Sequence, residues 1–163
     1  MATIRLQPRP RSSVFAMIAG CALTLVGARA CTSERAREQE TGRQLFAGER
    51  PLTATMAGHS APLPQDAVRC TNCHRRETGA VARPAAESAL DETQDFGPGL
   101  GAGSLTRGVA RRGGPPSVYD GGSFCRVLRE GIDPAHVVIA QTMPRYTMTP
   151  AECESVWIFL TAP

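Results

Sequence analysis

The sequence predicts an all-α domain in which three to five helices are joined by long loops. Helix start and stop signals recur along the chain, whereas no convincing strand pattern is present. Glycine and proline are frequent, with 16 and 13 residues, and this favours long irregular connections. Aromatic residues make up only 5% of the chain, so we expect something other than side chains to fill part of the interior.

Two helices are predicted ahead of the C-terminal region. The first spans residues 34–47 and is followed at once by a glycine. The second ends at Glu130 before Gly131, and either Asp120 or Ser123 caps its start. Its apolar face consists of Phe124, Val127 and Leu128.

The last helix has the clearest start signal. Thr149, Pro150 and Glu152 stand at the N-cap, N1 and N3 positions, which is the pattern of a capping box with proline in its favoured place. Three apolar residues of this helix are expected to face inward, namely Val156, Trp157 and Leu160.

Residues 79–116 are predicted to form a long loop because they are rich in Ala, Gly, Pro and Arg. A short helix is expected within this loop, over residues 85–92. No internal repeat is visible, and the chain of 163 residues fits one modest domain.

The first 30 residues have the features of an export signal. A basic segment precedes an apolar run over residues 14–28, which is shorter than the roughly 20 residues needed to span a bilayer. Small residues after this run supply a cleavage site. A competing motif, IAGC at residues 18–21, resembles a bacterial lipobox and would leave Cys21 lipidated. We therefore expect an export signal peptide over residues 1–30 and a periplasmic domain over residues 31–163, with membrane anchoring through the signal region or Cys21 as the alternative.

The charge pattern argues against nucleic-acid binding. The net charge of +3 depends on four arginines in the first 30 residues, and without them 14 arginines face 15 acidic residues. The remaining net charge of about −1 leaves no basic stripe for a phosphate backbone. The pair Arg111 and Arg112 is interpreted as part of a solvated loop.

The stretch VRCTNCHRRE at residues 68–77 places Cys70 three residues before Cys73, which His74 follows directly. A structural zinc site needs four ligands, usually from two Cys/His pairs, and no second pair is present in the sequence. Dithiol exchange would favour a preceding buried strand, but PLPQDAV precedes the motif instead. Covalent haem attachment needs two thiols for two vinyl groups and an adjacent histidine for the iron. The motif therefore predicts one haem c, bound through Cys70 and Cys73, with His74 as an iron ligand.

A second iron ligand is expected well downstream of the motif, so that the chain wraps around the haem. Met143 is the predicted ligand because Pro144 holds it out of helical geometry just ahead of the last helix. Tyr146 is expected to hydrogen-bond a haem propionate or a nearby carbonyl group. The alternative ligands are Met148, Met56, His59 and His136.

On these motifs the chain resembles a class I c-type cytochrome of the bacterial periplasm, from about Gly42 to Leu160. The resemblance rests on GRQLFAGE, CTNCH, GPGL and MPRYTMTPAECESVWIFL, in this order. It implies that residues 31–163 are a small cytochrome c domain wrapped around one haem, with His74 and Met143 as its axial ligands.

The resemblance also implies that a proline carbonyl group orients the proximal histidine. Pro98 in FGPGL matches that pattern, and Pro115 and Pro116 are the alternatives. The segment of about 20 residues at 50–69, between the first helix and the haem motif, departs from the family, in which these two parts often nearly abut.

The expected function is electron transfer rather than catalysis, because the chain itself occupies both axial positions of the iron. Its partners would be an exported dehydrogenase or a terminal reductase or oxidase. Two alternatives stay open: a cytochrome subunit of a larger membrane-associated oxidoreductase, and a haem sensor with a displaceable distal ligand.

Cys125 and Cys153 are the cysteines left after the signal region and the haem motif are set aside. In an oxidising compartment we expect them to form a disulfide bond between two helices. The alternative is that both are small buried core residues.

Overall fold

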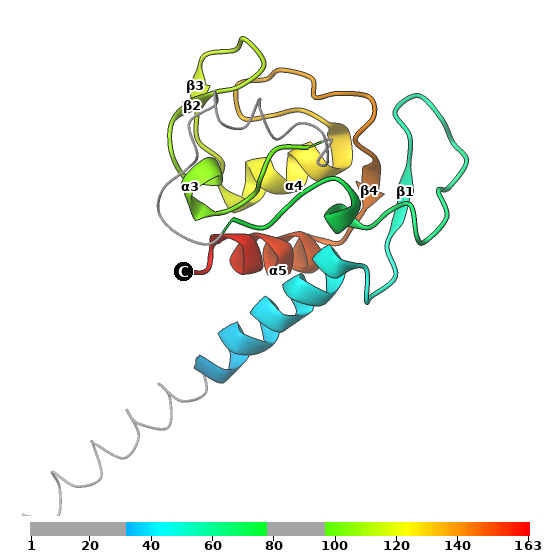
Figure 1. The fold of residues 1–163 in the computed structure, drawn as a ribbon, viewed down its shortest axis with the longest axis vertical. Coiled ribbons are helices and arrows are strands. Elements are labelled where there is room, and N and C mark those ends of the chain that lie inside the picture. The colour runs from blue at the N-terminus through cyan, green and yellow to red at the C-terminus, as the bar shows by residue number, and fades with distance from the viewer. Residues whose placement is uncertain (1–31, 78–96) are drawn as a thin grey trace, which may run out of the picture. The chain divides into compact units, whose positions relative to one another are not determined.

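The computed structural model describes residues 32–77 and 97–163 of the chain (Figure 1). The export signal expected over residues 1–30, with its lipidation motif, and the short helix expected over residues 85–92 lie outside these described residues. The segment Arg37–Pro163 forms a unit that contains the hydrophobic core and the residues of the predicted site.

The three helices that the sequence predicts are present. The first occupies residues 32–47, α4 spans Gly121–Glu130 and α5 spans Pro150–Thr161. The carboxylate of Asp120 caps α4 by accepting a hydrogen bond from an amide of the first turn at 2.7 Å. Gly131 ends α4 in the left-handed conformation, with a φ of 72°, as the stop signal predicts.

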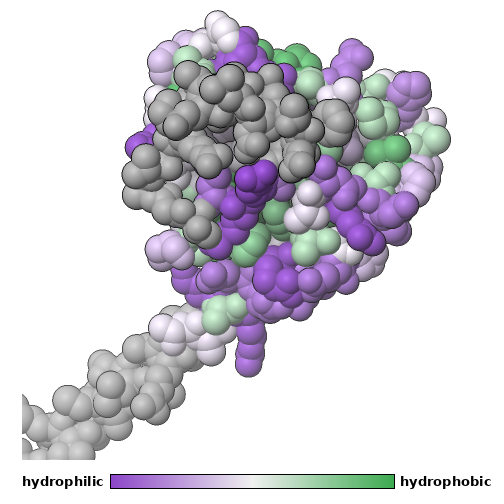
Figure 2. Space-filling view, in the orientation of Figure 1, coloured by the Kyte–Doolittle hydropathy of each residue, from purple (hydrophilic) through white to green (hydrophobic). Residues whose placement is uncertain are grey.

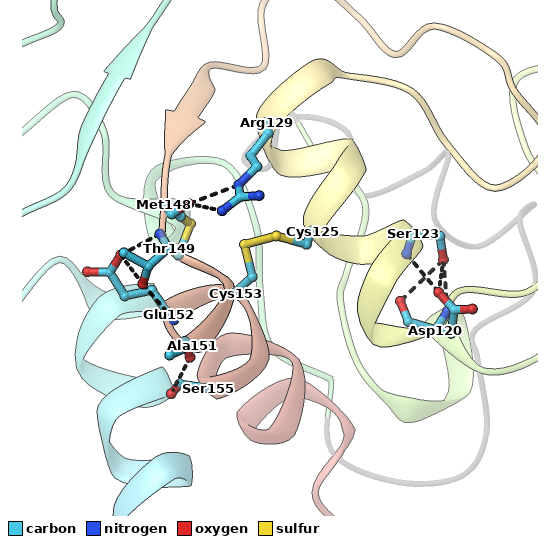
Figure 3. The surroundings of a disulfide bond; sticks show 10 residues. All are labelled: Asp120, Ser123, Cys125, Arg129, Met148, Thr149, Ala151, Glu152, Cys153 and Ser155. Atoms are coloured by element: carbon cyan, nitrogen blue, oxygen red, sulfur yellow. Dashed lines mark hydrogen bonds between the residues drawn. A yellow bond between two sulfur atoms is a disulfide. The ribbon is translucent and has the colours of Figure 1, made fainter.

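Thr149 and Glu152 form the predicted capping box at the start of α5 (Figure 3). The Thr149 amide donates to Glu152 Oε2 at 2.8 Å, and the Glu152 amide donates to Thr149 Oγ1 at 3.2 Å. Val156 and Leu160 are buried as predicted, whereas Trp157 is only half-buried. More than one face of α5 is buried, because four further residues of the helix are also buried: Cys153, Ser155, Ile158 and Phe159.

Four short strands accompany the helices in the described ranges, so the expectation of an all-α domain is met only in part. β1 (Thr53–Thr55) pairs antiparallel with β4 (Arg145–Thr147), and β2 (Val109–Ala110) pairs antiparallel with β3 (Pro116–Ser117). Each strand has only two or three residues, too few for an alternating pattern to stand out in the sequence. The described domain is therefore a helical core with two small two-stranded sheets.

Regular structure also interrupts the long loop predicted over residues 79–116. Its described part holds α3 (Ala102–Leu105) and the turn that joins β2 to β3. Leu105 is buried in the core, and its carbonyl oxygen accepts a hydrogen bond from the Tyr119 amide at 3.0 Å. A single helical turn has no hydrophobic period, so the sequence pattern does not reveal it.

The first helix crosses α5 in close contact at Gly42. A Cβ atom placed on Gly42 would lie 1.9 Å from the carbonyl oxygen of Ser155 and 2.8 Å from the Cβ of Phe159. One turn further along, the rings of Phe46 and Phe159 have centroids 5.7 Å apart. Glycine therefore lets the two helix backbones approach, and the contact joins the start of the domain to its last helix.

The segment at residues 50–69, which departs from the resembled family, is tied into the domain. Its strand β1 lies beside β4 (Figure 1), and the Gln65 side chain bonds the backbone of Leu52 in both directions, at 3.2 and 2.9 Å. Val68 at its end is buried. The segment therefore serves as a wall of the domain.

Hydrophilic residues predominate on the described surface of the face shown in Figure 2, and hydrophobic residues lie there in small separate areas. Among the described residues, the large hydrophobic side chains that are exposed are Val109, Val118 and Val138. None of the helices that the structure describes is long and apolar enough to cross a bilayer.

Candidate functional site

The predicted attachment motif forms one tight turn. Cys70–Asn72 is a single 3-10 turn, η1, and the Cys70 carbonyl oxygen accepts hydrogen bonds from the amides of Cys73, at 3.2 Å, and His74, at 2.9 Å. Both cysteines are free thiols and are half-buried. The turn thereby presents two thiols and one imidazole from five consecutive residues.

Burial raises the pKa of the Cys70 thiol to about 11, so this thiol is protonated at neutral pH. A cysteine that performs dithiol exchange has a pKa lowered to about 3.5–7.5, because the thiolate is the attacking species. The environment of Cys70 therefore argues against dithiol exchange at this motif. It is consistent with a thiol that lines an apolar cavity.

Two adjoining cavities lie between the motif, α4 and the loop that precedes β4. The first has a volume of about 360 Å³, and we call it the cysteine cavity because Cys70 and Cys73 line it. The second has a volume of about 420 Å³, and we call it the aspartate cavity because Asp133 lines it. His74 and Met143 line both, so they stand where the two cavities meet.

The ring of His74 is fixed by a backbone carbonyl group. Its Nδ1 lies 2.8 Å from the carbonyl oxygen of Pro98. Because a carbonyl oxygen only accepts hydrogen bonds, Nδ1 is the donor, and in the neutral ring Nε2 is then the nitrogen without a proton. The proline contact that the resemblance implies is thus made by Pro98, and neither Pro115 nor Pro116 lines the two cavities.

The segment around Pro98 is held against the motif by a ladder of backbone hydrogen bonds. The Gly97 amide donates to the Cys73 carbonyl at 2.9 Å, the Leu100 amide to the Arg75 carbonyl at 2.8 Å, and the Glu77 amide to the Leu100 carbonyl at 2.7 Å. A Cβ atom on Gly97 would lie 2.4 Å from Cε1 and 2.6 Å from Nδ1 of the His74 ring. The glycine therefore supplies the space that the imidazole occupies.

Replacing Gly97 with alanine should displace the His74 ring and weaken its bond to Pro98. We expect the free energy of unfolding to fall by about 1–3 kcal/mol, which is the usual cost of overpacking. Urea unfolding of both proteins measures it. Gly108→Ala is the matched control, because a Cβ atom there meets nothing within 4 Å. Equal unfolding midpoints for the two variants would contradict this account of Gly97.

Among the methionines that the structure describes, Met143 differs from Met56 and Met148 in its position relative to the two cavities. It lines both cavities, whereas Met56 and Met148 line only the cysteine cavity. His59 and His136, whose imidazoles could also bind iron at the distal position, line neither cavity. Met143 is therefore the predicted ligand that shares both cavities with His74.

Tyr146 contacts a carbonyl group, which is one of the two partners expected for it. Its hydroxyl group donates to the Val68 carbonyl oxygen at 3.0 Å, two residues before Cys70. Burial, with the neighbouring Cys70 sulfur as a further cause, raises the pKa of Tyr146. The hydroxyl group therefore keeps its proton and links β4 to the attachment motif.

Arg111 lies in a loop, as interpreted, but its side chain is bound to the domain. Its guanidinium group donates to the Ser117 carbonyl at 2.5 Å and lies 4.9 Å from the centre of the Tyr119 ring. The β2–β3 turn brings these partners together, and no sequence pattern announces a turn between two-residue strands. Arg112 is exposed, as interpreted, but it also lines both cavities.

The predicted site residues thus come together at one place in the domain. Cys70, Cys73, His74 and Met143 all line the cysteine cavity, and Pro98 contacts His74. Sequence reasoning missed the aspartate cavity with its polar residues, which come from separate segments of the chain. The chain matches no protein-family model, no curated protein and no solved structure.

Proposed function

We propose that this chain is a periplasmic electron carrier with one covalently bound haem c in a small cytochrome c fold. Cys70 and Cys73 would form the two thioethers, and His74 and Met143 would be the axial ligands. The observation that carries the proposal is that His74 and Met143, which lie 69 residues apart, line the same two cavities beside two free thiols.

The two cavities support the proposal because they have the size and the lining of ligand pockets. Each volume, about 360 and about 420 Å³, lies in the range of roughly 300–1,000 Å³ that is usual for ligand pockets. Apolar side chains from α4 and α5 line the cysteine cavity, among them Phe124, Leu128, Val156 and Leu160. Such walls would exclude water from the iron.

The two cavities would hold different parts of the haem. Cys70 and Cys73 in the cysteine cavity would take the vinyl groups, and residues of the aspartate cavity would take the propionates. That cavity is lined by cationic and hydroxyl groups suited to carboxylates, from Arg111, Arg112 and Tyr119, and also by the acidic residues Glu77 and Asp133. We propose Arg111, Arg112 and Tyr119, in place of Tyr146, as the propionate-binding residues.

Haem supplies one-electron chemistry when it is bound, with iron alternating between the ferric and ferrous states. The Pro98 carbonyl oxygen would hold the His74 ring in one orientation, with Nε2 toward the iron. The neutral thioether of Met143 would stabilise the reduced state relative to a second histidine. Electron donors and acceptors would be an exported dehydrogenase and a terminal reductase or oxidase, which would meet the carrier through a small interface.

Covalent attachment tests the proposal directly. Expression together with haem-attachment machinery should give a red protein whose colour survives acid–acetone extraction. Cys70→Ala or Cys73→Ala should leave at most one thioether, whereas Cys125→Ala, the control cysteine variant, should keep both. Mass spectrometry of the intact chain measures the bound haem. Haem that extracts freely from the unaltered protein, or bound zinc in its place, would remove the proposal.

A further inference from the structure

Arg145 directs its side chain back onto the segment that contains Met143. Its Nη1 donates a hydrogen bond to the Met143 carbonyl oxygen at 2.5 Å. Pro144 stands between the two residues and has no amide hydrogen to offer this turn. The Met143 amide donates to the Ala140 carbonyl at 3.2 Å. Both backbone polar groups of Met143 are therefore bound, and the donor to its carbonyl oxygen is charged.

The same guanidinium group lies against the end of α4. A Cβ atom on Gly131, the C-cap residue, would lie 2.2 Å from Nε and 2.3 Å from Cζ of Arg145. Glycine therefore supplies both the left-handed conformation that ends the helix and the space that the guanidinium group occupies. The end of a helix carries a partial negative charge, which favours a cation at this position. Arg145 thus joins the Met143 carbonyl group to the C-terminus of α4.

The segment of residues 131–145, which we call the methionine loop, is closed at its base. It leaves α4 at Gly131 and returns at Arg145, and the Ile139 amide donates to the Gly131 carbonyl at 2.9 Å. The backbone of Arg145 is held separately, because it begins β4 and is paired with Thr55 of β1. Arg145 forms no ion pair within the described ranges. Its guanidinium group is therefore used to close the methionine loop.

α4 is also a wall of the place where the two proposed iron ligands meet. Phe124 and Leu128 of α4 line both the cysteine cavity and the aspartate cavity. His74 and Met143 line the same two cavities. A bond that fixes Met143 to α4 therefore also fixes its position relative to the two cavities.

We propose that Arg145 is the positioning residue of the distal iron ligand: it holds the methionine loop on α4, so that Met143 stays in the cavities and excludes small ligands from the iron. This inference rests on the proposed function. Movement of Met143 away from the iron would break a hydrogen bond from a charged donor, and the open state is populated less by that factor. Arg145 thereby favours the carrier over a sensor with a displaceable ligand.

Azide binding to the ferric, haem-loaded protein tests this role. Azide binds where Met143 has left the iron, so its apparent affinity measures the population of the open state. Arg145→Leu removes the donor to the Met143 carbonyl oxygen. We expect the affinity for azide to rise about tenfold to hundredfold, which is the contribution of a hydrogen bond to a charged group. The visible spectrum follows the titration.

Arg129→Leu is the matched control. Arg129 Nε donates to the Met148 carbonyl oxygen at 2.8 Å, so this variant loses the same kind of bond to a methionine that is not a proposed iron ligand. Both variants should unfold at a lower urea concentration, but only Arg145→Leu should bind azide more tightly. An equal rise in azide affinity in the two variants, or no rise in Arg145→Leu, overturns the role of Arg145.

A second measurement uses the unaltered protein and does not depend on the folding of a variant. In nuclear magnetic resonance spectra of the ferrous, haem-loaded protein, the guanidinium protons of Arg145 should exchange slowly with solvent and show a nuclear Overhauser contact to the Hα atoms of Gly131. Exchange as fast as that of the exposed Arg112 overturns the inference and leaves the electron carrier standing. A chain that binds no covalent haem overturns both.

Discussion

In the haem-loaded protein that we propose, replacing Met143 with alanine should abolish the methionine-to-iron charge-transfer band of the ferric form and open the iron to azide or carbon monoxide. The backbone of Met143 is held on both sides, because its amide donates to the Ala140 carbonyl at 3.2 Å and its carbonyl accepts from Arg145 at 2.5 Å. Its side chain is left to line both cavities. We expect the reduction potential to fall by more than about 59 mV, a tenfold change, because a soft neutral ligand is lost.

Met148→Leu is the matched control for this prediction. Met148 is buried, and its carbonyl oxygen accepts a hydrogen bond from Arg129 Nε at 2.8 Å, just before the N-cap of α5 (Figure 3). The substitution nearly conserves volume, so it should keep the band and cost less than about 1.5 kcal/mol of stability. The visible spectrum decides between the two residues. Loss of the band in Met148→Leu, with its retention in Met143→Ala, would reverse the assignment.

Reduction of the disulfide between Cys125 and Cys153 should lower the free energy of unfolding by about 3.5 kcal/mol. The bond confirms the predicted pairing and joins α4 to α5, as Figure 3 shows. The two cysteines lie 28 residues apart, and closing a loop of this length removes about that much entropy from the unfolded chain. The loop includes Met143, so the bond also restrains the predicted ligand. Denaturant unfolding with and without a phosphine reductant measures the effect.

The double variant Cys125→Ala with Cys153→Ala supplies the control for this measurement. It lacks the bond, so the reductant should leave its stability unchanged. Thioether bonds to haem are not reduced by phosphines, and the same experiment therefore isolates the disulfide. Two free thiols in the mass spectrum of the unreduced protein would contradict the pairing.

The parts of the fold that could be predicted from the sequence are those determined by neighbouring residues. Asp120 and Thr149 cap helices through hydrogen bonds to residues three positions away, so the sequence pattern contains both partners. β1 and β4 lie far apart in the sequence, and each has only three residues. The sequence around one strand therefore does not indicate that it pairs with the other. Their pairing depends on the packing of the core rather than on local pattern.

In the candidate site, too, the arrangement of neighbouring residues could be predicted, whereas contacts between distant residues could not. The closeness of Cys70, Cys73 and His74 could be predicted because a few consecutive residues contain all three. Asp133 stands in DPAH, which reads as an ordinary exposed turn, and it is buried only because the turn packs beside α4. The partners of Arg111 likewise come together only when the β2–β3 turn has formed.

The close contact of Gly42 with α5 has a consequence for the order in which the domain is made. The first helix and β1 are synthesised well before their packing partners, β4 and α5. Contacts between distant parts of a chain form late. We therefore expect the thiols of CTNCH to stay accessible until α5 and β4 have packed against the first helix and β1.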